Sequence, residues 1–493
     1  MLSLGRSCRA LKDICNPLIY ANITIEWGGE LDETHWNVPP QLRPLVKHLA
    51  LQLRCRRGRQ WMADDSDEEI FEWHCEPLPP PCFGEILASM HQLSQITLDI
   101  DPPAGHCHPW ALAQLLVSTP TLRGLSVRGL EIAPKDSCAL ECAVPALTSL
   151  TYLVGETGRP VRDSARNLQI LSSLLEATHN SVESLHLSAP LVPWSRVHEL
   201  EWPRLRALTV SGMVRLEVES YASILPQFAP RLDRLSLELS LASMSTTPLG
   251  GGTTAFPWPA LRHLALPLPL PEDDPAYARL PSTLEMLSLL CYPRHCATTA
   301  DTGLPRRRDF PLPASTGAMA AILRRCAASP GLRLTQLSVE YVADANDDND
   351  AVLALVSDAF PRLEELSLFR YRLDGAYEAP EATAAAVCAA LAPLTRLRVV
   401  RTPLDSSFWP EGDGDGFGRE TMQRVALAAA RELTGAPLEE IWLWTPSAGS
   451  VCEQGEWKVF QVLPGLGGGP RERESVDVHR RRWAVKVPQF LFG

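Results

Sequence analysis

The chain has 493 residues, of which 45% are hydrophobic and 21% are charged, as is usual for a globular protein with a large core. Its formal net charge of −12 argues against a nucleic-acid partner, because general nucleic-acid binders carry a basic face. No apolar run reaches the roughly 20 residues that a membrane-spanning helix needs, so we expect no membrane association. The thirteen scattered cysteines favour reduced thiols, and hence a cytoplasmic or nuclear location, over a disulfide framework.

The first predicted elements are a helix and a strand within residues 7–25, SCRALKDICNPLIYANITI. The apolar residues that would line one side of this helix are Cys8, Leu11, Ile14, Cys15 and Leu18. Pro17 then perturbs the helix, and the sequence ITI starts a strand. We therefore expect residues 1–40 to form a separate segment that also covers the first repeating unit, since a solenoid needs a terminal cap.

A phrase of the form Leu-x-x-Leu-x-Leu recurs along residues 41–446, with variable residues between the leucines. Its middle positions are Leu49, Ile96, Leu125, Leu150, Leu185, Leu208, Leu235, Leu264, Leu287, Leu337, Leu366, Leu397 and Ile441. Most spacings are about 23–35 residues, which is near the period of repeat proteins, and three are about twice 25. We expect about one hidden unit in each doubled gap, or roughly sixteen units in all.

Helix-like segments lie between the phrases, with apolar residues at positions i, i+3 and i+4. They cover residues 111–120, 167–180, 315–330, 350–361 and 420–435, and residues 383–394 read as a buried helix. Each unit is therefore predicted to be a strand, a turn and a helix, which makes successive strands parallel. The predicted fold class is α/β, a solenoid with a parallel sheet on its concave face and helices outside.

The leucines of each phrase should point into the core, and the residues between them should line the concave face, because side chains alternate along a strand. Aromatic residues gather on this face in the C-terminal half, and exposed Trp and Tyr residues are typical of binding hot spots. We predict partner contacts from Glu238, Tyr292, Glu340, Phe369, Tyr371, Trp442 and Trp444. The alternative is that the C-terminal tail folds back and buries Trp442 and Trp444 as a cap.

The remaining motifs do not predict a metal, phosphate or catalytic site. His74, Cys75, Cys82 and the HCH sequence at 106–108 lack the spacing of zinc ligands, so no metal site is expected. The acidic run 344–350 lacks the glycine and glutamate of a calcium loop. No phosphate loop and no catalytic set is found, so we predict a protein that is not an enzyme and needs no cofactor. Residues 447–493 are predicted to be an irregular, mobile tail.

These phrases resemble the leucine-rich repeat family over roughly residues 42–446, and the number of copies in register makes the resemblance specific. The family often has Asn three residues after the last leucine of the motif. Here that position holds Met213, Ser240 or Tyr371 in three of the units. The resemblance implies irregular repeats that hold a protein substrate or ligand on the concave face.

Residues 7–25 resemble the second half of an F-box, as found ahead of leucine-rich repeats in proteins of mushroom-forming fungi. The matching positions are Cys8, Arg9, Leu11, Ile14, Pro17, Leu18, Tyr20, Ile23 and Ile25. The resemblance implies docking on the Skp adaptor of a cullin–RING ubiquitin ligase through Cys8, Leu11, Ile14, Pro17, Leu18 and Tyr20, with the repeats holding the substrate. The family's opening Leu-Pro and apolar helix do not precede these residues, so we expect weak adaptor binding. The alternative is a leucine-rich-repeat scaffold with no ligase association.

Overall fold

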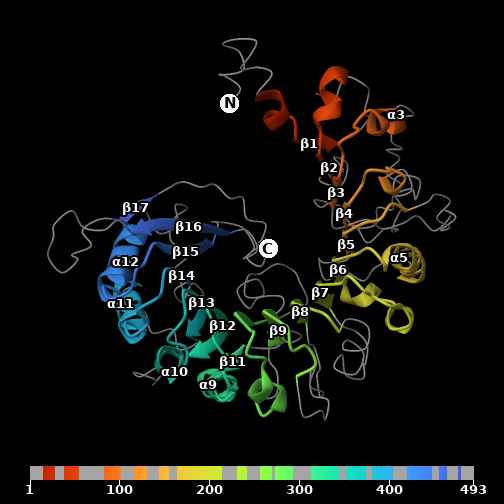
Figure 1. The fold of residues 1–493 in the computed structure, drawn as a ribbon. Coiled ribbons are helices and arrows are strands. Elements are labelled where there is room, and N and C mark those ends of the chain that lie inside the picture. The colour runs from red at the N-terminus through yellow and green to blue at the C-terminus, as the bar shows by residue number, and fades with distance from the viewer. Residues whose placement is uncertain are drawn as a thin grey trace, which may run out of the picture. The chain divides into compact units, whose positions relative to one another are not determined.

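The computed structural model divides the chain into two compact units. The N-terminal unit comprises Met1–Gly212 and Gln227–Arg231, and the C-terminal unit comprises Met213–Pro226 and Leu232–Gly493. The residues described are 15–27, 38–54, 83–101, 116–129, 144–154, 164–213, 230–240, 256–268, 272–291, 313–343, 351–372, 380–402, 419–446, 455–462 and 476–478. Each unit is a mixed α/β structure with a mostly parallel sheet (Figure 1).

Within its described residues, the N-terminal unit has seven parallel strands that pair in chain order. They are β1 (Asn22–Trp27), β2 (His48–Arg54), β3 (Gln95–Asp101), β4 (Gly124–Arg128), β5 (Ser149–Leu153), β6 (Ser184–Ser188) and β7 (Ala207–Met213). The middle leucine of each phrase stands opposite the middle leucine of the next, as Leu150 does opposite Leu185. These side chains are buried, so they form one continuous column in the core.

The C-terminal unit repeats this arrangement with a second set of parallel strands. They are β8 (Arg234–Ser240), β9 (His263–Leu268), β10 (Met286–Cys291), β12 (Gln336–Ala343), β13 (Glu365–Arg372), β14 (Val399–Thr402) and β15 (Glu440–Pro446). The short β11 (Ala314–Ser315) pairs with the end of β12. Leu287, Leu337 and Leu366 are aligned and buried, as the leucine phrases predict.

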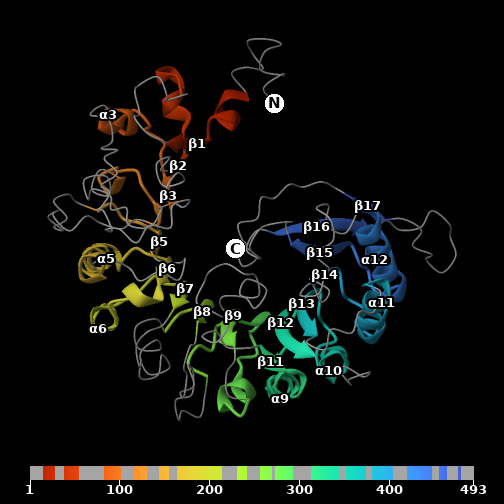
Figure 2. The same cartoon turned by 180° about the vertical axis from the view of Figure 1, so that it is seen from behind.

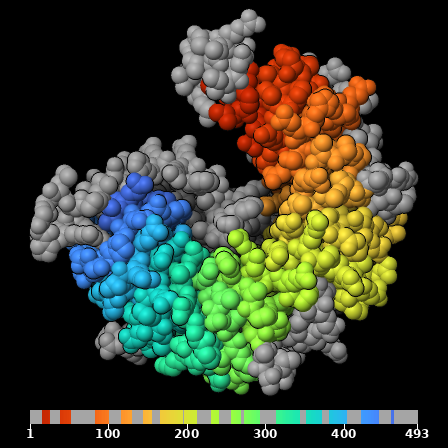
Figure 3. Space-filling view, in the orientation of Figure 1, coloured from red at the N-terminus to blue at the C-terminus, as the bar shows by residue number. Residues whose placement is uncertain are grey.

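The strands begin in the same way, which keeps neighbours in register. The N–H groups of Glu364 and Glu365 both donate to the carbonyl oxygen of Thr335, at 2.8 and 3.0 Å. The same pair of bonds stands at the start of β2 to β7 and of β9 to β15, the two-residue β11 apart. Within each unit, successive bands of colour in Figure 3 show each segment packed against the segments before and after it in the chain.

Helices of the N-terminal unit lie on one side of its sheet, as Figure 1 shows for α5 and Figure 2 for α5 and α6. Those with described bounds are α3 (Phe83–Ala88), α5 (Ser164–Thr178) and α6 (Trp194–Val197), with the 3-10 helices η2 (Pro40–Leu45) and η4 (Ala189–Leu191). The buried residues of α5 include Ile170, Leu171, Leu174 and Leu175, which recur at helical spacing and form its core face.

The helices of the C-terminal unit are α9 (Thr316–Ala327), α10 (Ala351–Ala359), α11 (Pro380–Leu391) and α12 (Arg419–Glu432), with the 3-10 helix η5 (Pro275–Arg279). The start of α9 is capped by Ser315, whose Oγ accepts the N–H of Ala318 at 3.3 Å. The helices predicted at 315–330, 350–361 and 420–435 are confirmed. None of the helices in the described ranges is long and apolar enough to cross a bilayer.

The predicted domain boundaries are corrected at both ends. The sheet begins before residue 41, because β1 lies inside the segment 1–40 and pairs with β2 along its whole length. It also continues past residue 446, because β16 (Gly455–Val462) pairs antiparallel with β15 and β17 (Val476–Val478) pairs with β16. Residues 447–493 therefore include sheet strands. An antiparallel strand does not need a crossover connection, so it need not follow the spacing of the parallel units.

The prediction of hidden units is wrong. The strands on either side of each doubled gap pair directly: β2 with β3, β10 with β12, and β14 with β15. Apart from the two-residue β11, which pairs only with the end of β12, this direct pairing leaves no place for an intervening strand. The long spacings are therefore insertions between neighbouring strands.

The predicted alignment of one phrase is also wrong. Val400, and not Leu397, stands opposite Leu366 and Ile441. Leu397 is buried as the first leucine of its phrase. Arg401 therefore occupies the outward position that the sequence pattern assigned to Arg398.

Candidate functional site

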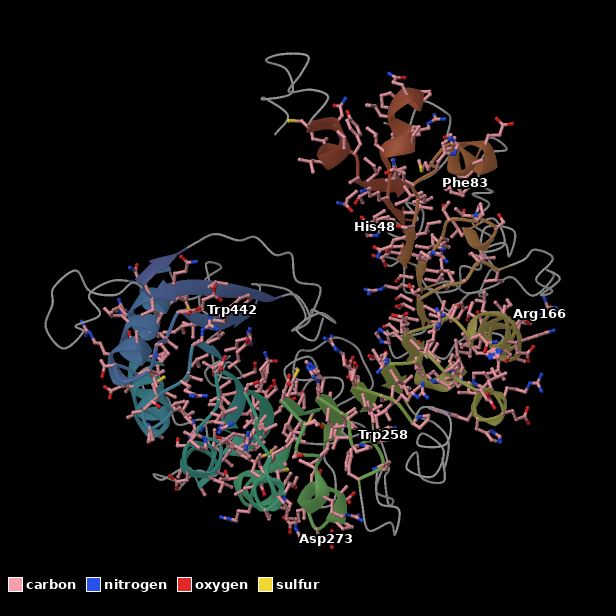
Figure 4. The ribbon with its side chains drawn as sticks, viewed as in Figure 1. His48, Phe83, Arg166, Trp258, Asp273 and Trp442 are labelled. Atoms are coloured by element: carbon pink, nitrogen blue, oxygen red, sulfur yellow. The ribbon has the colours of Figure 1, made fainter. Side chains whose placement is uncertain are left out.

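Each sheet has one face toward the helices and one face away from them, because side chains alternate along a strand. We call the surface opposite the helices the inner face of each unit. In Figure 4 the labelled His48 and Trp442 project from the inner faces, whereas Phe83 belongs to a helix on the other side. The inner faces carry the side chains that vary from strand to strand, and they are the candidate binding surfaces.

The inner face of the N-terminal unit carries small polar side chains. One row across the strands consists of half-buried small residues and includes Thr97, Ser126, Thr151 and Thr209. His48 borders this row, with its Nε2 atom 3.1 Å from Oγ1 of Thr97. Short hydroxyl side chains leave the backbone approachable and offer both donors and acceptors, which suits a protein partner.

His186 occupies the same row on β6, and its Nε2 atom lies 3.1 Å from Oγ of Ser211. Burial, with a further contribution from the positive charge of Arg128, lowers the pKa of His186 to about 4. The imidazole is therefore neutral near pH 7. Ser211 is only 1% exposed, so this pair is placed to join two strands rather than to attack a substrate.

The inner face of the C-terminal unit contains a buried cluster formed by Phe369 and Tyr371. The hydroxyl group of Tyr371 donates to Oε1 of Glu340 at 3.0 Å, and the N–H of Cys291 donates to Oε2 at 2.8 Å. Glu340 is 0% exposed. Its burial is tolerated because both carboxylate oxygens accept hydrogen bonds.

This burial corrects the prediction that Glu340, Phe369 and Tyr371 are exposed for partner contacts. The alternation of side chains places them on the inner face as expected. However, long side chains on adjacent strands cover one another, and alternation alone does not report that. These three residues belong to the packing of the unit.

A second cluster on the same face is partly exposed and runs across β12 to β15. Nη1 of Arg401 donates to Oε2 of Glu365 at 2.8 Å, and the guanidinium lies 5.3 Å from the ring centroid of Trp442. Nε2 of Gln336 donates to Oε1 of Glu365 at 3.1 Å. Nε1 of Trp442 donates to Oε2 of Glu440 at 2.7 Å. The cluster holds these polar groups in fixed positions on the surface.

Of this cluster, the sequence pattern identified Trp442 alone. Glu365, Arg401 and Glu440 were missed, Arg401 because its phrase was aligned three residues too early. The signal was present: Leu397 and Val400 have the same spacing as Leu363 and Leu366. The alternative prediction was that the C-terminal tail covers Trp442 and Trp444. The tail does supply β16, in which Val459 stands opposite Trp442, and Trp442 is half-buried.

The other predicted residues are placed as follows. Glu238 is half-buried and accepts from Oγ of Ser236 at 3.1 Å. In the N-terminal segment, Pro17 is exposed, Leu18 is 62% exposed and Tyr20 is half-buried. Lying outside the described residues are Cys8, Leu11, Ile14, Tyr292 and the side chain of Trp444.

The described residues hold no group of three or more His, Cys, Asp or Glu side chains that could bind a metal ion. The histidines and cysteines at 74–82 and 106–108, and the acidic run 344–350, lie outside the described ranges. Burial raises the pKa of Cys388 to about 12, so this thiol does not form the thiolate that a nucleophile requires near neutral pH.

No protein-family model matches this chain, and no curated protein matches it. The arrangement of the inner faces is therefore the basis for a functional assignment.

Proposed function

We propose that the chain is a leucine-rich-repeat protein that binds a partner protein on the inner faces of its units. The observation that carries the proposal is the strand register, which buries the middle position of each phrase and leaves variable residues on one face. A constant frame with a variable face is typical of repeat proteins that bind other proteins. We propose that it acts in the cytoplasm or nucleus by binding, without catalysis or cofactor.

The more specific proposal is that the chain is the substrate-recognition subunit of a cullin–RING ubiquitin ligase. It is supported by the resemblance of residues 7–25 to an F-box and by the exposure of Leu18, since docking needs an accessible apolar side chain. A helix of this size supplies about half of the roughly 800 Å² that a specific interface usually buries per partner. The binding of the Skp adaptor by this chain is therefore expected to be weak.

A repeat scaffold with no ligase association is the second candidate. Cys15 is buried and β1 joins the sheet, which supports a role for this segment in covering the first strands. A titration with purified Skp adaptor distinguishes the ligase proposal from the scaffold proposal. The adaptor is titrated against the chain, against a fusion that supplies a complete F-box, and against each of these with Leu18→Arg. Stronger binding by the fusion, lost with Leu18→Arg, supports the ligase role; no binding by the fusion favours the scaffold.

The binding role itself is tested with peptides of about 12 residues selected from a random library on the full chain, long enough to cross several strands about 4.8 Å apart. Ser126→Arg and Val399→Arg place a bulky charge on the two inner faces. Ala177→Arg and Ala389→Arg are matched controls at exposed helix positions. At least one inner-face variant should abolish the binding of each peptide without changing the unfolding midpoint. If only the helix variants affect binding, the inner-face proposal is wrong.

A further inference from the structure

The partly exposed cluster on β12 to β15 has an unbalanced charge. We call it the acidic–aromatic patch and define it by Glu365, Val399, Arg401, Glu440 and Trp442. All five residues are half-buried and stand in adjacent positions of the register. Two carboxylates face one guanidinium, so the patch carries one excess negative charge.

The two carboxylates have different partners. Glu365 forms an ion pair with Arg401, whose guanidinium also lies against the Trp442 ring. Within the described ranges, Glu440 accepts only the neutral N–H of Trp442, through Oε2, and forms no ion pair. The cation of Arg401 is paired with Glu365 instead. Glu440 is therefore the carboxylate on this patch that lacks a cation.

We infer that the acidic–aromatic patch binds a segment of the partner protein in which a lysine or arginine stands next to an apolar residue. The cation pairs with Glu440, and the apolar residue packs on Trp442 and Val399. Charge complementarity selects this occupant: a second acidic segment would meet the excess negative charge, and an apolar segment alone would leave Glu440 desolvated without a cation. The inference rests on the proposed binding function and specifies the chemistry of the partner.

The competing explanation is that Glu440 only orients the indole of Trp442. Glu440→Gln distinguishes the two, because the amide oxygen of glutamine still accepts the indole N–H while the negative charge is lost. Glu183→Gln is the matched control, since Glu183 is exposed in the other unit and the substitution changes the net charge equally.

The test uses the library peptides of about 12 residues selected on the full chain, resynthesised with a fluorophore and titrated by anisotropy. The subset whose binding is lost with Val399→Arg should carry a lysine or arginine beside an apolar residue. Glu440→Gln should weaken this subset about fivefold at low salt, and Glu183→Gln should leave it unchanged. Added salt should reduce the difference.

Two outcomes would overturn the inference. Peptides that depend on Val399 but lack a basic residue, or that bind Glu440→Gln as tightly as the unaltered chain, refute the patch assignment while leaving the binding function intact. A selection that yields no peptide sensitive to either inner-face variant refutes the binding function together with the inference.

Discussion

The guanidinium of Arg401 is fixed between the carboxylate of Glu365, 2.8 Å from Nη1, and the indole ring of Trp442, 5.3 Å from Cζ. These contacts join β13, β14 and β15 on the inner face of the C-terminal unit. The side chain of Arg401 is 17% exposed, so the interactions are partly shielded from solvent. They order Trp442, which is more exposed than Phe369 and Tyr371, the other predicted aromatic contacts whose side chains the structure describes.

Arg401→Ala should lower the free energy of unfolding by about 1–2 kcal/mol, because it removes both a partly shielded ion pair and a cation–π contact. Arg401→Lys keeps the charge but not the planar group that stacks on the ring, so its cost should lie between those of the unaltered chain and the alanine variant. Urea denaturation followed by tryptophan fluorescence measures both. Equal stability of Arg401→Ala and the unaltered chain would show that the stack contributes nothing.

Leu366→Ala should cost about 2–5 kcal/mol, because Leu366 is 0% exposed in the central column of the C-terminal unit. Leu18→Ala is the control, since Leu18 is 62% exposed and its truncation should change stability by less than about 0.5 kcal/mol. Chemical denaturation compares the two. A small effect at Leu366 would contradict the observed strand register.

Tyr371→Phe should cost about 1–3 kcal/mol, because it takes a hydrogen bond from the buried carboxylate of Glu340. The effect should appear as lower stability of the C-terminal unit. The folded fraction of the Tyr371→Phe variant should bind the selected peptides as tightly as the unaltered chain does. If a fully folded Tyr371→Phe variant loses peptide binding, Tyr371 contacts the partner after all.

His186 should make stability depend on pH. Because its pKa is about 4 in the folded chain and about 6.5 when unfolded, the neutral form is favoured by folding. This contribution, up to about 3 kcal/mol, is complete above pH 6.5 and is lost as the pH falls from 6.5 to 4. His186→Gln should remove that part of the pH dependence, whereas His91→Gln, at an exposed position, should not. Unfolding midpoints measured from pH 7.5 to pH 4 test this, and parallel curves for both variants would rule it out.

Much of the fold could be predicted from the sequence, because the leucine spacing reports both strand position and strand direction. Leu287, Leu337 and Leu366 are aligned as their phrases require. The errors arose where the signal was ambiguous. Leu394 and Leu397 formed a plausible phrase three residues too early, and β16, which pairs antiparallel, carries no leucine phrase.

The candidate site was less predictable. Alternation indicates which face a residue occupies, but exposure depends on neighbours from distant strands. Phe369 and Tyr371 were correctly assigned to the inner face and yet are buried, since Leu290, Val342 and Trp442 pack against them. The charge imbalance at Glu440 needs the positions of Glu365 and Arg401, and the misaligned phrase had displaced Arg401.

Photo-cross-linking tests the central claim, that partners dock on the inner face, most directly. A benzophenone side chain is introduced at Val399 on the inner face or at Ala389 on the exposed surface of α11. The selected basic peptides should cross-link from position 399 and not from position 389. Cross-linking from position 389 alone would contradict the account, because it would place the partner on the helices rather than on the inner face.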